Sequence, residues 1–153
     1  MKSNSYNEAR SDLRETAREL KKDVRDEART TLNTVKDAAK EKKQEIRDEF
    51  RAERDMERTI DDSYSRQNIR DARKEMRAER DAVNYEVSQA RENFNDEQVD
   101  FRDNVAQLKY EARQTDSAAS VYRKADRMAD SALSTENAME ADMLDSLDNI
   151  ENI

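Results

Sequence analysis

The stretch DLRETARELKK DVRDEARTTLN TVKDAAKEKKQ EIRDEFRAERD (12–55) repeats one 11-residue pattern four times in succession. One column of the pattern is apolar, and the column four residues later holds alanine or phenylalanine. Because residues four apart lie on one side of an α-helix, the two columns form a single seam along a long helix. The seam residues are Leu13, Ala17, Val24, Ala28, Val35, Ala39, Ile46 and Phe50.

This 11-residue period predicts both the extent and the twist of the first helix. Eleven residues in three turns correspond to about 3.67 residues per turn, which keeps a seam straight or slightly right-handed. The pattern ends near Ile60, so we predict a hendecad-repeat helix over 1–60. The seam is narrow because the column that Leu20 begins continues with the polar residues Thr31, Lys42 and Glu53. The alanines of the seam allow a partner helix to approach closely.

The composition predicts an all-α fold. The 153 residues include no Gly, Pro, Cys, His or Trp, so the residues that most often make turns are missing. Charged residues make up 43% and apolar residues 34%, a balance typical of long helices with narrow seams. We therefore predict long amphipathic helices that form a coiled coil or an elongated helical bundle.

A polar cluster, DDSYSRQN (61–68), follows the repeat and is the best candidate for a hinge or turn. Asp and Ser cap helices by accepting hydrogen bonds from free backbone N–H groups. The cluster is consistent with a hairpin of two helices. A single helix running straight through it is the alternative, because the cluster contains no Gly or Pro.

The second half changes to a seven-residue period, which predicts a heptad helix over 69–114. Apolar residues seven apart favour left-handed coiled-coil packing, in which phenylalanines are the largest buried groups. We expect these residues to continue the self-association seam of the first helix. They are Val87, Phe94, Phe101 and Leu108.

Two further helices are predicted after a polar segment near residue 115. The third helix covers 115–133, and a break at Ser134 and Thr135 starts a C-terminal helix over 134–153. That last helix is amphipathic and has six acidic residues and no basic one, so it carries most of the net charge of −8. Its apolar residues either dock in a basic groove of a partner or close the chain's own bundle. They are Met139, Met143, Leu144, Leu147 and Ile150.

The repeat in 12–55 resembles the 11-residue amphipathic repeats of group 3 late-embryogenesis-abundant proteins and, more distantly, those of exchangeable apolipoproteins. TVKDAAKEKKQ (34–44) is the most similar block. The resemblance implies a helix that folds on drying or on contact with lipid. The repeat departs from these families because its basic residues lie mainly on one flank of a narrow seam, whereas lipid-binding helices carry them on both flanks of a broad apolar face.

The residue types argue against catalysis, cofactors and metals. The sequence has no His or Cys to serve as base, nucleophile or soft ligand, and no Gly-rich phosphate loop. The bases of the repeat form a stripe of the kind that can follow the phosphates of a nucleic acid. Each of them has an acidic residue within one turn, however, which argues against phosphate binding. We predict no enzyme, no cofactor, no metal site and no nucleic-acid partner.

These patterns favour a structural protein that self-associates through coiled-coil helices into a homo-oligomer, filament or assembly scaffold. The alternative is an amphipathic-helix protein that acts on lipid surfaces or protects against desiccation. A helical protein partner for the acidic C-terminal helix and a lipid surface are further expected partners. The sequence contains no signal peptide and no run of about 20 apolar residues, so the expected location is the cytoplasm.

Overall fold

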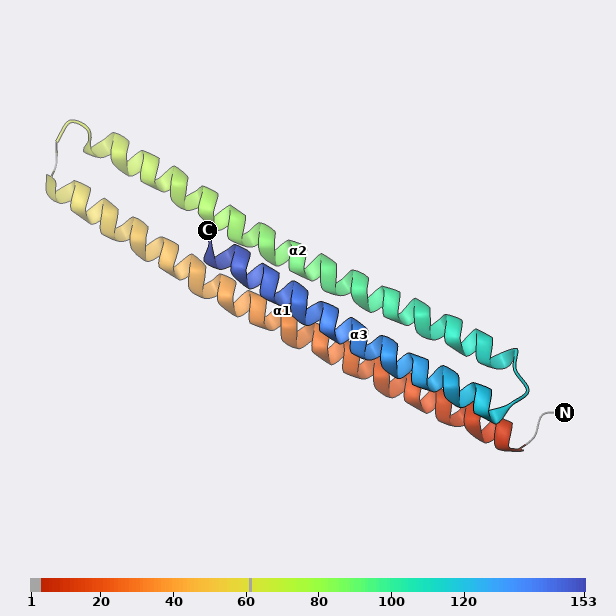
Figure 1. Cartoon of the computed structure of the whole chain (residues 1–153). Coiled ribbons are helices and arrows are strands. Elements are labelled where there is room, and N and C mark those ends of the chain that lie inside the picture. The colour runs from red at the N-terminus through yellow and green to blue at the C-terminus, as the bar shows by residue number, and fades with distance from the viewer. Residues whose placement is uncertain (1–3, 61) are drawn as a thin grey trace. The chain divides into compact units, whose positions relative to one another are not determined.

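The protein is all-helical. The computed structural model describes residues 4–60 and 62–153, and these contain three α-helices and no strand. The helices, coloured in chain order in Figure 1, are α1 (Asn4–Ile60), α2 (Ser65–Arg113) and α3 (Ala118–Glu151). Residues 1–3 of the predicted first helix and residue 61 of the predicted hinge lie outside the described residues.

A short turn without glycine separates α1 from α2. The carboxylate of Asp62 accepts a hydrogen bond from the backbone N–H of Tyr64 at 2.8 Å. The hydroxyl of Ser65 accepts one from the backbone N–H of Asp62 at 3.0 Å. These side chains satisfy N–H groups that the start of a helix leaves free, as a capping box does. The chain therefore breaks within the predicted hinge, but α2 begins at Ser65 and includes the second half of that segment.

The connection between α2 and α3 uses the same kind of chemistry. The hydroxyl of Thr115 donates to the carbonyl oxygen of Ala112 at 3.1 Å and so satisfies one of the last carbonyl groups of α2. The hydroxyl of Ser117 accepts from the backbone N–H of Ser120 at 3.4 Å in the first turn of α3. Thr115 and Ser117 belong to the polar segment in which the sequence predicts this break.

The predicted break at Ser134 and Thr135 is wrong, because α3 continues without interruption from Ala118 to Glu151. The hydroxyl of Thr135 donates to the carbonyl oxygen of Ser131, four residues earlier, at 2.8 Å. Such a bond satisfies the hydroxyl inside the helix, so it does not compete with the helical backbone. The predicted segments 115–133 and 134–153 thus belong to one helix.

The chain folds as two compact units. Unit 1 contains the described part of Met1–Thr31 together with Glu92–Asp142. Unit 2 contains Leu32–Arg91 and Met143–Ile153. Each unit therefore receives a segment of all three helices.

In unit 1, α1 and α3 run parallel. The hydroxyl of Tyr122 donates to the carboxylate of Asp12 at 2.9 Å, and further along both helices Glu140 lies close enough to Glu27 to raise its pKa. The helix α2 runs in the opposite direction to α3. Lys124 forms an ion pair with Glu111 at 3.2 Å, a pair that places the start of α3 beside the end of α2.

The core of unit 1 contains the largest buried side chains of the chain. Tyr6, Met128 and Met139 have no exposed surface, and Phe101 exposes only 2%. Alanines fill the remaining space where two helices approach closely. The other buried residues of this core are Ala9, Leu13, Ala17, Val24, Ala28, Thr31, Phe94, Val105, Leu108, Ala112, Val121 and Ala132.

In unit 2, α1 and α2 are antiparallel. The amide of Asn68, near the start of α2, donates to the carboxylate of Glu57 near the end of α1, at 3.2 Å. Further along α2, Asn84 accepts from the amino group of Lys43 at 3.0 Å. The buried apolar residues are smaller than those of unit 1, with no aromatic side chain among them. They are Val35, Ala39, Ile46, Ala72, Val83, Ala90 and Ile150.

Candidate functional site

The predicted self-association seam lies mostly within the cores of the two units. In α1, every residue of the two seam columns is buried except Phe50, which is half-buried. In α2, Phe94, Phe101 and Leu108 are buried and Val87 is half-buried. These side chains pack against other helices of the same unit. Apart from half-buried residues such as Phe50, any surface for a second molecule therefore has to be made mainly by other residues.

The predicted partner-docking tail is also largely buried within the two units. Met139 has no exposed surface and Ile150 exposes 2%, while Met143 and Leu147 are half-buried. Leu144 is different, because 58% of it is exposed. At about 100° per residue it lies well outside the face that the other four residues share. The structure thus brings four of the five predicted residues to one buried face.

Tyr6 joins the first turns of α1 to the end of α2 through a buried hydrogen bond. Its ring has no exposed surface, and its hydroxyl donates to the carbonyl oxygen of Ala112 at 2.9 Å. The guanidinium of Arg10 lies 6.0 Å from the ring centre, within the range of a cation–π contact. A buried tyrosine of this kind fixes the register between two helices, because its hydroxyl needs a partner at one position.

We expect Tyr6→Phe to lower the free energy of unfolding by about 1 kcal/mol, the typical net contribution of a buried hydrogen bond. The loss is limited because the carbonyl of Ala112 keeps the hydroxyl of Thr115 as a donor. Urea unfolding followed by circular dichroism measures it. Tyr122→Phe is the matched control, since its hydrogen bond to Asp12 is exposed. A larger loss for the control than for Tyr6→Phe contradicts the assignment.

Acidic side chains of α3 face acidic side chains of the other helices in unit 1. Burial of the Glu97 carboxyl on α2, together with its hydrogen bond to Asp142 on α3 and the charge of Asp142, raises the pKa of Glu97 to about 8. Its Oε2 atom is buried and accepts no hydrogen bond from an N–H or O–H donor of another described residue, so a proton carried by the carboxyl pair itself has to satisfy it. The pair therefore keeps a proton at neutral pH.

A second group of carboxyls lies between α1 and α3. Burial raises the pKa of Glu27, and the charges of Glu140 and Glu136 raise it further. The pKa of Glu136 is also raised, by burial and then by the charge of Asp23. Contact between α1 and α3 is therefore favoured by protonation of this group as well.

Basic residues gather between α1 and α2 in the same unit. Burial lowers the pKa of Lys109 on α2, and the adjacent charge of Lys21 on α1 lowers it further. Arg18 and Arg113 add smaller effects in the same direction. Like charges thus meet on both sides of α2, and the core contacts of unit 1 must offset their repulsion.

A groove with acidic walls lies between α1 and α2 in unit 2, and we call it the acidic groove. Its apolar floor consists of Ile46 and Phe50 on α1 and of Ala72 and Met76 on α2. Two glutamates from each helix line its walls, and burial followed by the charges of its neighbours raises the pKa of one of them, Glu79. The wall residues are Glu49, Glu53, Glu75 and Glu79.

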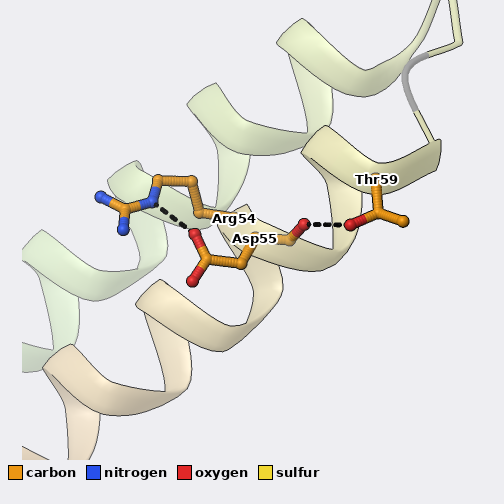
Figure 2. A network of polar contacts seen from close by, with 3 residues as sticks. All are labelled: Arg54, Asp55 and Thr59. Atoms are coloured by element: carbon orange, nitrogen blue, oxygen red, sulfur yellow. Dashed lines mark hydrogen bonds and ion pairs between the residues drawn. The ribbon is translucent and has the colours of Figure 1, made fainter.

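Two arginines flank Phe50, the aromatic residue of this floor. The guanidinium of Arg73 lies 5.8 Å from the ring centre, and that of Arg54 lies 6.0 Å from it. Arg54 is held in place by its neighbours, because its Nε atom donates to Asp55 at 3.3 Å (Figure 2). Thr59 donates to the backbone carbonyl of Asp55 at 2.9 Å, as the same view shows.

Neither the carboxyl pair nor the acidic groove was predicted from the sequence. A signal for the groove is present, because Glu49 and Glu53, like Glu75 and Glu79, are four residues apart. Like charges at that spacing disfavour an isolated helix and so call for an explanation. No such signal exists for Glu97 and Asp142, which are far apart in the sequence and meet only through the register of α2 and α3.

The described residues do not form a group of three or more acidic side chains placed to hold a metal ion. No described helix is long and apolar enough to cross a membrane. What the fold defines is an all-helical protein whose outward faces are mostly charged. No protein-family model, curated protein or solved structure matches this chain.

Proposed function

We propose that this chain is a non-enzymatic structural protein that self-associates through its helices into an oligomer, filament or assembly scaffold. The observation that supports it is a row of apolar side chains on the outer face of α3 in unit 1. Tyr122 is 44% exposed and Leu133 is 59% exposed, and Ala129 between them is exposed too. At about 100° per residue the three lie on one side of the helix.

Such a row is suited to pairing between copies. Isolated apolar residues on a surface are common, but residues spaced by seven and four positions on one helix make a continuous stripe. Two copies of α3 placed side by side would bury Leu133 and Ala129 against each other. Since the core residues of unit 1 are already buried, this outer stripe is an apolar surface that unit 1 retains for assembly.

The proposal includes coiled-coil packing, with hendecads in the first half and heptads in the second. The burial of Leu13, Val24, Val35 and Ile46, which recur at the period of the repeat, supports the hendecads. Phe94, Phe101 and Leu108, seven apart and buried, support the heptads. We place the protein in the cytoplasm as part of the same proposal.

An alternative function at lipid surfaces or in desiccation requires the bundle to open. A helix that lies on lipid turns its apolar face outward, and here that face forms the core. No exposed feature of the described residues favours this alternative over self-association. Circular dichroism with anionic vesicles tests this alternative. Lipid binding would expose the core residues of the units to lipid and so change the thermal unfolding transition.

We expect the mass of the purified chain to rise with concentration in light scattering. Leu133→Lys places a charge in the outer stripe and is expected to weaken self-association by about tenfold or more, because each copy loses a buried leucine. Ser134→Lys adds the same charge one residue further on, at an exposed position outside the stripe, and is expected to leave self-association unchanged. A chain that stays monomeric at every concentration contradicts the proposal.

A further inference from the structure

Only part of the α1–α2 pair in unit 2 is covered by α3. Near the end of α3, Lys42 donates a hydrogen bond to the carbonyl oxygen of Glu151 at 3.3 Å, and Asn149 donates one to Glu86 at 3.2 Å. α1 continues beyond Lys42 as far as Ile60. Along that stretch the described part of unit 2 contains two helices and no third one.

The acidic groove lies on the side of the pair where α3 packs. On a helical wheel at about 100° per residue, Glu49 and Glu53 point in nearly the same direction as Lys42, the α1 residue that contacts α3. On α2, Glu75 and Glu79 share their direction with Glu86 in the same way. The groove therefore occupies the position that a third helix would take if it continued past Glu151.

The two arginines beside Phe50 lie on the other side of the pair. Arg54 is more than about 100° away from Lys42 on the wheel of α1, and Arg73 is more than about 100° away from Glu86 on the wheel of α2. Their charges thus point away from the groove. Lys42 remains at its inner end, where its charge lowers the pKa of Glu79 against the stronger effects that raise it.

Apolar surface extends the groove toward the turn. Met56 and Ile60 are each 55% exposed, although both are large apolar residues on a helix. Both share the direction of Lys42 on the wheel and so lie on the groove side of α1. The acidic groove thus combines an apolar floor, two acidic walls and an exposed apolar end. These are the features of a binding site for an amphipathic helix.

We propose that the acidic groove binds an amphipathic helix of a partner protein, one that carries Lys or Arg on both flanks of an apolar seam. The uncovered stretch of α1 from Lys42 to Ile60 has the length of a partner helix of about five turns. The flanking bases meet the glutamates of each wall, and the seam covers Phe50 and Met76. This inference goes beyond self-association and does not depend on it.

Charge decides between this partner and a second copy of the chain. A second copy that docked groove to groove would bring the same four glutamates of each molecule together, and like charges across an interface oppose binding. The acidic end of α3 is an equally poor match, because it has no basic residue. Lys and Arg flanks are the complement that the walls require.

The test uses the full chain and a fluorescent peptide of about 18 residues, with a leucine seam and lysines on both flanks. Fluorescence anisotropy is expected to show binding of this peptide and at least tenfold weaker binding of the same peptide with glutamates in place of lysines. The double variant Glu53→Gln/Glu75→Gln is expected to bind the basic peptide about tenfold more weakly, because it loses one charge from each wall. Ile60→Ser is expected to weaken binding as well, about threefold.

The matched control is Glu15→Gln/Asp26→Asn, which removes two exposed carboxylates from unit 1 and gives the same net charge. It is expected to bind the basic peptide as the unchanged protein does. Equal weakening by both double variants would mean that binding follows net charge alone and would overturn the groove assignment, as would equal affinity for the two peptides. Failure of the unchanged protein to bind the basic peptide would overturn it directly.

Discussion

Phe101→Ala is expected to lower the free energy of unfolding by about 3–5 kcal/mol, the usual cost of removing a phenylalanine from a core. Phe101 exposes only 2% of its surface and is among the largest buried side chains of unit 1. Its loss leaves a cavity that rigid helices fill poorly. Urea unfolding measured by circular dichroism gives the difference.

Val99→Ala serves as the control for Phe101→Ala, because Val99 lies two residues away on α2 and is 41% exposed. We expect the control to cost less than about 1 kcal/mol, since a half-exposed side chain loses little buried area. Similar losses for the two variants would show that Phe101 is not a core residue. A normal helical signal in both variants before urea is added makes the comparison valid.

The burial of the seam also changes how self-association has to be tested. Asp at Val35 or Phe101 places a charge in a dry core, so the variants Val35→Asp and Phe101→Asp would unfold a unit before they affected an interface between copies. A loss of assembly in either variant would thus report stability. Variants on the outer face of α3, such as Leu133→Lys, separate the two effects because they leave the core intact.

Much of the fold was predictable from local chemistry. Helix was the regular structure that a chain without Gly or Pro favoured, and the two turns fall at segments rich in capping residues, with Asp62 and Ser117 as examples. The seam columns of α1 were identified as apolar faces, and almost all their members are buried. The predicted break at Thr135 was wrong because threonine occurs both inside helices and at their ends. The sequence does not show which backbone group its hydroxyl bonds to, and that partner distinguishes the two positions.

The partner of the seam could not be predicted from the sequence. A narrow apolar stripe is equally suited to a second copy and to another helix of the same chain, since both bury the same side chains. Leu13 and Leu108 would be buried whether the seam packs against a second copy or against another helix of the same chain. The difference depends on whether the turns reverse the chain and on the register between helices, neither of which the period of a single helix encodes.

Register also explains why the acidic contacts of α3 could not be predicted. The six acidic residues of 134–153 leave two alternatives open in the sequence, a tail that docks on a partner and a helix that closes the chain's own bundle. In unit 1, the first of them lie against α1 and α2, where Glu136 is close to Asp23 and Asp142 to Glu97. Packing of the segment 134–153, which has no basic residue, against acidic neighbours makes the stability of unit 1 depend on protonation.

The direction of that dependence follows from Glu97. Its pKa is about 8 in the folded chain and near 4.5 when exposed, so between these values the folded state holds a proton that the unfolded state has lost. The free energy of unfolding therefore falls as pH rises through this window. The favourable contribution is complete below about pH 4.5 and is lost above about pH 8. Glu27 and Glu136, whose pKa values are also raised, act in the same direction.

Glu97→Gln is expected to raise the free energy of unfolding at pH 8.5 by about 1–2 kcal/mol and to change it little near pH 4.5. The amide keeps a hydrogen bond to Asp142 without a second charge. The effect stays within this range because the Glu97 side chain is partly exposed to solvent, and water screens part of the repulsion that raises its pKa. Glu92→Gln, at an exposed position of the same helix, is the control and should leave the slope with pH unchanged. A proton shared between Glu97 and Asp142 must make the free energy of unfolding depend on pH. If urea unfolding across pH 4.5–8.5 gives the same slope of this free energy with pH for Glu97→Gln as for the unchanged chain, the carboxyl pair does not link α2 to α3.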